Sequence, residues 1–387
     1  MPMTRIRALI CGALFALSPV LASPGLAQLD YDGRAPNVLV MDYASGQILV
    51  ERNADVPLPP ASMSKLMTLN MLFEALVDGR VQMDTTFSVS QRAHAMGGSR
   101  MFLELRHRPT VEDLIRGIAV LSGNDATVVV AEGLAGTEDN FARLATARAR
   151  QLGMENTTLM NASGWPHPEH RMSLRDLAIL ARHMLEEHGE YYPYLAEREF
   201  TWNNITQPNR VPLLGAGLGL DGLKTGHTSE AGYALTGSAV QGERRVIFVF
   251  SGLSSERERA EEAERIINWA FRQFSELGVA SEGQALAEAE VWMGASARVT
   301  LVAPRDYTVV VPVFAEGETT ARVEYDGPVA APIAEGQELA RLVISTPGMA
   351  ELSLPLVAGH DVAEGGFMPR MRSAAVVLAG HLGLVAR

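Results

Sequence analysis

The amino-acid sequence predicts an α+β domain, an antiparallel sheet flanked by helices, followed by a small all-β domain. Three observations support this prediction. Apolar residues recur at helical spacing from Ser62 to Gly79 and again between Thr110 and Gly133. A hairpin pattern follows around Gln241-Gly242, and short β patterns punctuated by Gly, Pro and Asp occupy the C-terminal part. The length of 387 residues allows two domains.

The first segment, residues 1–27, has the features of a signal peptide. Two arginines precede an apolar core from Ala8 to Leu17, and Gly25 to Ala27 offer a small-residue cleavage site. The only cysteine, Cys11, lies inside this segment, so the mature chain would hold no disulfide and no thiolate metal site. We therefore expect an exported, periplasmic protein.

The charge of the chain disfavours nucleic acid as a partner. The formal net charge is −12, and removing the signal peptide would make the mature chain more acidic, because that segment carries arginines and no acid. Nucleic-acid binding needs a basic surface that faces the phosphates. We expect no nucleic-acid partner.

The first polar motif, Ser62-Met63-Ser64-Lys65, begins the predicted helix that runs to Gly79. Residues three apart share a helix face, so the Lys65 amine can reach the Ser62 hydroxyl. A serine hydroxyl becomes a nucleophile when a base removes its proton. Lys65 can be that base only when neutral, with its pKa about three units below the ordinary value of roughly 10.4. Burial and a second cation, for which Lys224 is the candidate, would lower the pKa in this way.

The second motif, Ser122-Gly123-Asn124, lies on the connection between two apolar helical patterns. Thr110 and Asp113 form a capping box before the first of these helices, and the second is predicted to begin near Asp125. The turn presents a hydroxyl and an amide, which suit proton relay and the binding of a substrate amide. Taken alone, the same pattern also fits an ordinary turn between helices.

The third motif, Lys224-Thr225-Gly226-His227, comes just before two strand patterns, Tyr233 to Ala239 and Val246 to Phe250, that form a hairpin. A glycine in an edge strand lets a substrate backbone approach and pair as an added strand. The lysine and threonine can hold a carboxylate. Three motifs in this order predict a serine acyl-transfer site.

With these motifs the chain resembles the low-molecular-mass penicillin-binding proteins of the D-alanyl-D-alanine carboxypeptidase group, a serine DD-peptidase family. Other similar stretches, within roughly residues 35 to 275, are Ile115 to Ile118, Asp221 to Thr228 and Ala231 to Tyr233. The resemblance implies the β-lactamase/DD-peptidase-like fold and a D-Ala-D-Ala carboxypeptidase. Such an enzyme removes the terminal D-alanine from peptidoglycan stem peptides through an acyl-enzyme and is acylated by β-lactams.

The resemblance also implies roles for individual residues. Ser62 would be the nucleophile, Lys65 the general base and Lys224 their electrostatic partner, with Ser122 and Asn124 as the second catalytic element. The backbone N–H groups of Ser62 and His227 would form the oxyanion hole. The residues expected to bind substrate are Lys224, Thr225, Gly226, His227 and Arg259. No cofactor is expected.

Two classes of alternative remain open. The same site could act as a DD-endopeptidase or a β-lactamase, and the chain could be a non-catalytic protein that binds cell-wall peptides. Gly123 and the lack of an E-x-x-L-N sequence between the second and third motifs disfavour a class A β-lactamase. Intact Ser62, Lys65 and Lys224 disfavour the non-catalytic alternative.

The sequence predicts no metal site. His167 and His170 have H-x-x-H spacing, but Pro166, Pro168 and Glu169 indicate a loop, so both are expected to be ordinary surface histidines. Asp176 is expected to be a first-turn acid of a helix rather than a catalytic group.

The C-terminal part is predicted to contain a β domain and a membrane-associating tail. The catalytic domain is placed at residues 28–277, with a helix over 265–274, a small polar segment at 278–283 and the β domain at 284–363. The β patterns are Ala297 to Val302, Thr308 to Val313, Ala321 to Tyr325, Leu339 to Ile344 and Glu351 to Pro355. Residues 366–387 form an amphipathic pattern too short and interrupted to span a bilayer. We expect this tail to attach the protein peripherally to the outer face of the cytoplasmic membrane.

Overall fold

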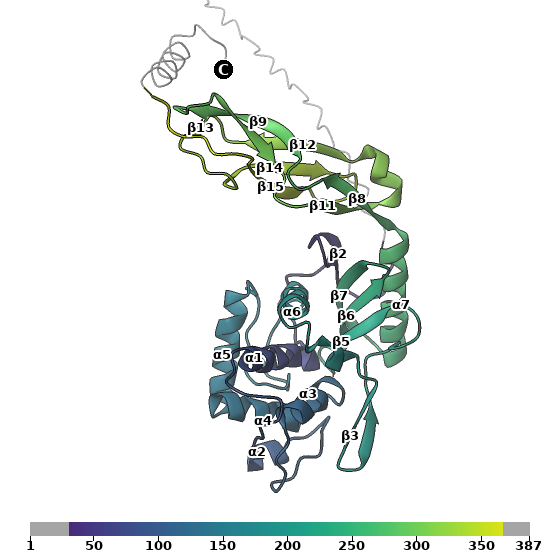
Figure 1. Ribbon diagram of the computed structural model, residues 1–387. Helices are drawn as coiled ribbons and strands as arrows, with labels where there is room; N and C mark the ends of the chain where they lie inside the picture. Colours follow the sequence, from purple (N-terminus) through teal and green to yellow (C-terminus); the bar gives the residue numbers. More distant parts are fainter. Residues whose placement is uncertain (1–30, 367–387) are drawn as a thin grey trace, which may run out of the picture.

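A computed structural model describes residues 31–366 of the chain (Figure 1). It contains an α+β domain, and the long helix α7 (Glu256–Arg272) leads from this domain to an all-β domain. The predicted signal peptide, 1–27, and all of the predicted tail except Gly366 lie outside the described residues. Within residues 31–366, no helix is long and apolar enough to cross a membrane.

The α+β domain is built on a five-stranded antiparallel sheet in the order β2-β1-β7-β6-β5. Its strands are β1 (Asn37–Asp42), β2 (Ile48–Arg52), β5 (Leu220–Thr228), β6 (Gly232–Gln241) and β7 (Arg244–Leu253). The predicted hairpin is therefore present as β6 and β7. β5, which carries the third motif, is an edge strand of the sheet. Helix α7 packs on one face, where Ile266 and Ala263 join Phe248 and Phe250 in one apolar core.

The helices between the first and third motifs pack together around α1, which lies near the centre of the group in Figure 1. They are α1 (Lys65–Val77), α2 (Gln91–His94), α3 (Val111–Ala119), α4 (Asn124–Ala135), α5 (Glu138–Gln151) and α6 (Leu174–Glu187), with 3₁₀ turns η1 (Ala61–Ser64) and η2 (Tyr192–Ala196). The predicted capping box of Thr110 and Asp113 is present at the start of α3. A second apolar core joins these helices to the other face of the sheet.

Three predicted boundaries differ from the structure. The first helix begins at Lys65 rather than Ser62, because Ala61 adopts a left-handed φ of 49° and the following turn closes as a 3₁₀ turn. α7 begins at Glu256 rather than Arg265, capped by Ser255, because its first turns are charged and show little apolar periodicity. The small polar segment at 278–283 overlaps β8 (Phe274–Ala280), which pairs with β11 and so lies in the β domain.

The all-β domain contains a six-stranded sheet and a separate two-stranded pair, β11-β8. The order in the larger sheet is β12-β14-β15-β10-β9-β13. The remaining elements are β9 (Ala285–Trp292), β10 (Arg298–Val302), β11 (Tyr307–Pro312), η3 (Val313–Glu318), β12 (Thr320–Tyr325), β13 (Val329–Ala330), β14 (Glu338–Ser345) and β15 (Leu352–Ala358). The five predicted β patterns correspond to β10, β11, β12, β14 and β15. β8, β9 and β13 were not predicted, nor was the hairpin of β3 (Glu199–Trp202) and β4 (Ile205–Pro208).

Candidate active site

Ser62 and Lys65 meet at the start of the central helix. Ser62 lies in η1, and Lys65 is the first residue of α1. The Lys65 Nζ donates to Ser62 Oγ at 2.7 Å and to the Ser163 carbonyl oxygen at 2.5 Å. Lys65 is completely buried, whereas Ser62 remains partly exposed. A base and a hydroxyl are therefore within proton-transfer distance, and the hydroxyl is open to a ligand.

Burial and positive charge lower the pKa values of both lysines at the site. Burial holds the pKa of Lys65 well below its usual value, and Lys224 and Arg210 lower it further. The nearby Asp125 acts in the opposite direction. Burial, together with Arg210 and Arg259, lowers the pKa of Lys224 to about 7. These effects favour the neutral form of Lys65, which is the form that can accept a proton, while Lys224 is close to its midpoint near pH 7.

The second motif is held rigidly between α3 and α4. Ser122 is buried and adopts a left-handed φ of 58°, a conformation that L-residues keep only where the surrounding structure fixes it. Asn124 opens α4, and its Nδ2 donates to the Gly97 carbonyl at 2.8 Å. The buried Asp125 accepts from the backbone N–H groups of Met101 (2.8 Å) and Leu103 (3.0 Å). Asp125, which the sequence analysis did not single out, thus fixes the adjoining loop against the motif.

The third motif places Lys224, Thr225 and Gly226 in buried positions on the edge strand β5. At Gly226 a Cβ atom would lie 2.9 Å from the Pro60 carbonyl oxygen and 3.1 Å from Met63 Cγ. Glycine therefore lets β5 pack directly against the turn that carries Ser62. The sequence predicts that a substrate backbone approaches this glycine. The close approach in the structure is instead between two segments of the chain that are far apart in sequence.

His227 and Arg259 both lie against the ring of Tyr233. The exposed His227 ring stacks on it, with centroids 4.0 Å apart, and the Arg259 guanidinium carbon lies 5.5 Å from its centroid. Arg259 is only 6% exposed, and its Nε has no hydrogen-bond partner among residues 31–366. The nearest carboxylate oxygen, on Glu256, is 3.9 Å away. A buried guanidinium with unused donors is suited to binding an anion.

A loop that the sequence analysis missed delivers the carbonyl that faces Lys65. The Asn161 side-chain oxygen accepts from the backbone N–H groups of Ser163 (3.2 Å), Gly164 (2.8 Å) and Trp165 (3.0 Å). Gly164 has a φ of +78°, and a Cβ there would lie 1.9 Å from the Ala61 carbonyl oxygen. Asn161 and Gly164 together hold the loop against the nucleophile turn. The only sequence signal for this loop was the N-x-x-G spacing of Asn161 and Gly164.

One histidine of the H-x-x-H pair does not lie at the surface as expected. His170 is 2% exposed, and its Nδ1 accepts from the backbone N–H of Met160 at 3.0 Å. Its loop folds back on itself through a bridge between Thr158 and Arg171, which buries the ring. Burial, with smaller effects from His167 and Lys65, lowers the pKa of His170 to about 4. His167 is exposed, as expected.

Both domains match known families. The family profile described as D-alanyl-D-alanine carboxypeptidase matches residues 26–254, and the profile described as the C-terminal domain of penicillin-binding protein 5 matches residues 274–364. D-alanyl-D-alanine carboxypeptidase DacC of Escherichia coli K12 is 34% identical over 95% of this chain and 94% of its own length. DacF of Bacillus subtilis is 32% identical over 92% of each chain.

Solved structures of proteins with similar sequences also share the fold of this chain. Penicillin-binding protein 5 from Haemophilus influenzae superimposes with a TM-score of 0.78 at 35% identity, covering 85% of this chain and 98% of that protein. Penicillin-binding protein D2 from Listeria monocytogenes, in a structure described as the ampicillin-bound form, has a TM-score of 0.58 at 28% identity. That match covers 63% of this chain and all of the Listeria chain.

Proposed function

Because this chain belongs to the D-alanyl-D-alanine carboxypeptidase family, we propose that Ser62 is the residue on which its acyl-enzyme forms. The enzyme is a serine-type carboxypeptidase of that family, and its substrates by family are peptidoglycan peptides. The observation that carries the assignment to Ser62 is the 2.7 Å contact between its Oγ and the buried Nζ of Lys65. The pKa of that amine is lowered by burial and by Lys224, which favours the neutral form that can take the hydroxyl proton.

Acylation then follows from the arrangement of these groups. Neutral Lys65 removes the Ser62 proton, and the Oγ attacks the carbonyl carbon of the penultimate D-alanine. The backbone N–H groups of Ser62 and His227 stabilise the negative charge that develops on the carbonyl oxygen. As the C–N bond breaks, a proton passes to the leaving D-alanine amine through Ser122, with Asn124 holding the substrate amide. Water then attacks the ester carbonyl as Lys65 accepts its proton, and Lys65 returns that proton to Ser62 Oγ as the acyl–oxygen bond breaks, which releases the shortened peptide and the free enzyme.

The terminal carboxylate of the substrate would meet a cluster of cations beside the third motif. Lys224 and Arg259 both lie in buried positions near β5, and Thr225 adds a hydroxyl on the same strand. Two partly desolvated cations bind a carboxylate more strongly than exposed ones would, because few waters compete. This cluster favours a peptide with a free C-terminus, as a carboxypeptidase requires.

The same serine should react with β-lactams. A β-lactam presents a strained amide and a carboxylate at a spacing similar to that of an acyl-D-Ala-D-Ala terminus, so Ser62 would open the ring and remain esterified. The Listeria relative described in an ampicillin-bound form supports this proposal.

We also propose a location for the enzyme. The family is one of exported cell-wall enzymes, and the sequence of residues 1–27 is that of a signal peptide. The amphipathic pattern of residues 366–387 would hold the mature enzyme at the outer face of the cytoplasmic membrane, as a peripheral rather than a spanning protein.

Product analysis tests the proposed function. The purified enzyme is incubated with a stem pentapeptide ending in D-Ala-D-Ala, with a cross-linked muropeptide and with penicillin. Release of free D-alanine that is lost in Ser62→Ala and retained in Ser64→Ala supports the carboxypeptidase. Cleavage of the cross-link alone would indicate an endopeptidase, and rapid penicillin turnover without D-alanine release would indicate a β-lactamase. Peptide binding without any product would leave only the non-catalytic alternative.

A further inference from the structure

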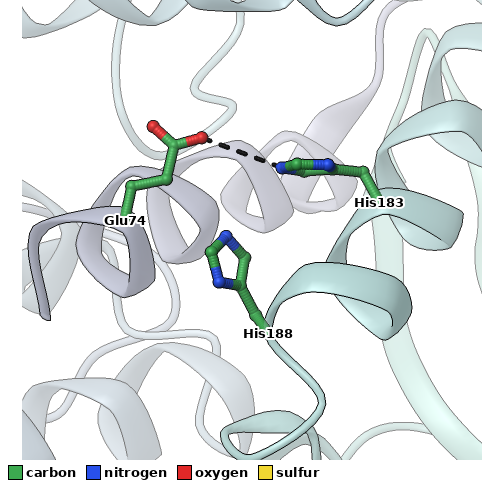
Figure 2. A group of neighbouring side chains, drawn as sticks. All are labelled: Glu74, His183 and His188. Atoms are coloured by element: carbon green, nitrogen blue, oxygen red, sulfur yellow. Dashed lines mark ion pairs between the residues drawn. The ribbon is translucent and has the colours of Figure 1, made fainter. Parts of the chain in front are cut away.

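A second cluster of polar side chains lies in the helical part of the catalytic domain, away from Ser62. Figure 2 shows Glu74 on α1, His183 on α6 and His188 just beyond the end of α6. One ligand atom from each of these residues lies within 4.8 Å of the others. Glu74 follows Lys65 by more than two turns of α1, about 13 Å along the helix axis. The proposed acyl-transfer chemistry uses none of the three.

The imidazole of His188 is buried and that of His183 is half-buried, and both have buried nitrogens without the partners that such polar atoms normally have. His188 is 4% exposed, and neither of its ring nitrogens has a hydrogen-bond partner among residues 31–366. The Nε2 of His183 also lacks one within that range, since the nearest Glu74 oxygen is 3.8 Å away. Figure 2 shows a nitrogen of His188 directed toward the space between the other two side chains. Burying a nitrogen without a hydrogen-bond partner costs free energy of folding, so a ligand bound between these nitrogens would remove that cost.

Two imidazoles and one carboxylate form a ligand set that suits zinc. Zn²⁺ binds histidine nitrogen at about 2.0–2.1 Å and carboxylate oxygen at about 2.0–2.2 Å in a tetrahedral arrangement. Ligand atoms in such a site lie about 3.4 Å apart, so each atom here would need to move inward by about 1 Å or less.

The surroundings of the cluster leave room for a cation. Arg148 Nε and Asn70 Nδ2 each donate to Glu74 Oε1 at 2.8 Å, which orients the carboxylate so that this same oxygen lies 3.8 Å from His183 Nε2, and an ion would share Oε1 with these two donors. Arg148 itself opposes a cation, so the site is expected to bind less tightly than one without it. His183 also lines a cavity of about 450 Å³ that the exposed Glu186 borders, whereas Glu74 and His188 do not line it.

We propose that Glu74, His183 and His188 bind one divalent transition-metal ion of the zinc type, with water as the fourth ligand. The ion would connect α1, whose first turn carries Lys65, to the end of α6. Its role is to stabilise the helical part of the domain, because the ligands lie too far from Ser62 to touch a substrate held there.

Metal binding to the untagged, chelator-treated full chain tests this proposal. Titration with Zn²⁺ should show one ion bound per chain, and Co²⁺ should give the intense visible absorption of a four-coordinate ion. Zinc should also raise the melting temperature. We expect His188→Gln and Glu74→Gln each to weaken Zn²⁺ binding at least about tenfold. The matched control, His167→Gln, removes an exposed histidine outside the cluster and should bind as the unmodified chain does.

Labelling by a fluorescent penicillin serves as the folding control for these variants. A variant that is labelled normally yet fails to bind zinc has lost the metal site and not the fold. If the unmodified chain binds no stoichiometric Zn²⁺, or if the two ligand variants bind it as tightly as His167→Gln, the cluster is only an acid–imidazole contact and the proposal is wrong.

Discussion

Replacing Lys224 by methionine should make the catalytic domain more stable while removing the cation that we propose holds the substrate carboxylate. Lys224 is 1% exposed, and burial is the main reason why its pKa falls from 10.5 to about 7. Methionine has a similar length and no charge, so it fills the same space without that cost. Under the proposed function, the enzyme keeps a destabilising group at this position because Lys224 binds the substrate carboxylate.

The magnitude follows from the pKa of Lys224. A lysine whose pKa drops from 10.5 to about 7 lowers the free energy of unfolding by about 5 kcal/mol when it is charged in both states. Between these two pH values the unfolded chain binds the extra proton, so the stability of the unmodified enzyme rises with pH. The advantage of Lys224→Met is therefore greatest below about pH 7 and should shrink by about 2.5 kcal/mol between about pH 6 and about pH 9.

Urea unfolding at these two pH values measures the effect. A Trp292→Phe background removes the tryptophan of β9, so the fluorescence reports on the three tryptophans outside the β domain. Because Lys224 also lowers the pKa of Lys65, the comparison is repeated after Lys65→Met has been introduced into both the unmodified protein and the Lys224→Met variant. An equal difference in unfolding free energy at both pH values, or a less stable methionine variant at about pH 6, would refute the reasoning.

Four further perturbations test other parts of the site. The kcat/KM for acylation should fall as the pH drops through the lowered pKa of Lys65, and a profile without such a fall on its acid side contradicts this expectation. For peptides with a free carboxylate, kcat/KM should also fall above about pH 7 as Lys224 loses its proton. Arg259→Gln should raise KM roughly tenfold or more for a peptide acid but little for the matching C-terminal amide, and equal effects on both would exclude the carboxylate contact. Asn161→Ala should slow acylation about tenfold, because the Ser163 carbonyl loses its support; an unchanged acylation rate would mean that this loop does not hold Lys65. Truncation after Glu364 should leave activity on small peptides unchanged and abolish sedimentation with lipid vesicles, whereas equal sedimentation would show that residues 366–387 are no anchor.

The sequence predicted the elements that are locally encoded. The capping box before α3 and the hairpin of β6 and β7 follow from short patterns of polar and apolar residues that the structure reproduces. β9 was missed because its sequence, ALAEAEVW, is rich in residues that favour helices. Its pairing with β10 is a tertiary interaction that outweighs this preference.

The sequence predicted the motif residues of the candidate site but not the groups that surround and hold them. Each motif residue has a side chain with recognisable chemistry, and the contact between Ser62 and Lys65 follows from their spacing on one turn. The Ser163 group at the site is a backbone carbonyl, which no side-chain pattern marks. Tyr233 packs against Arg259, and the charge of Arg210 lowers the pKa of Lys224. The burial of His170 depends on how its loop folds back. Such contributions require the three-dimensional structure.

The most direct test of the central claim is to identify the residue that a penicillin acylates. The enzyme is labelled with a fluorescent penicillin, digested, and the modified peptide is sequenced by mass spectrometry. The label should map to Ser62, and Ser62→Ala should remain folded but unlabelled. Modification at any other residue, or labelling of Ser62→Ala at the normal rate, would contradict the assignment of Ser62 as the nucleophile.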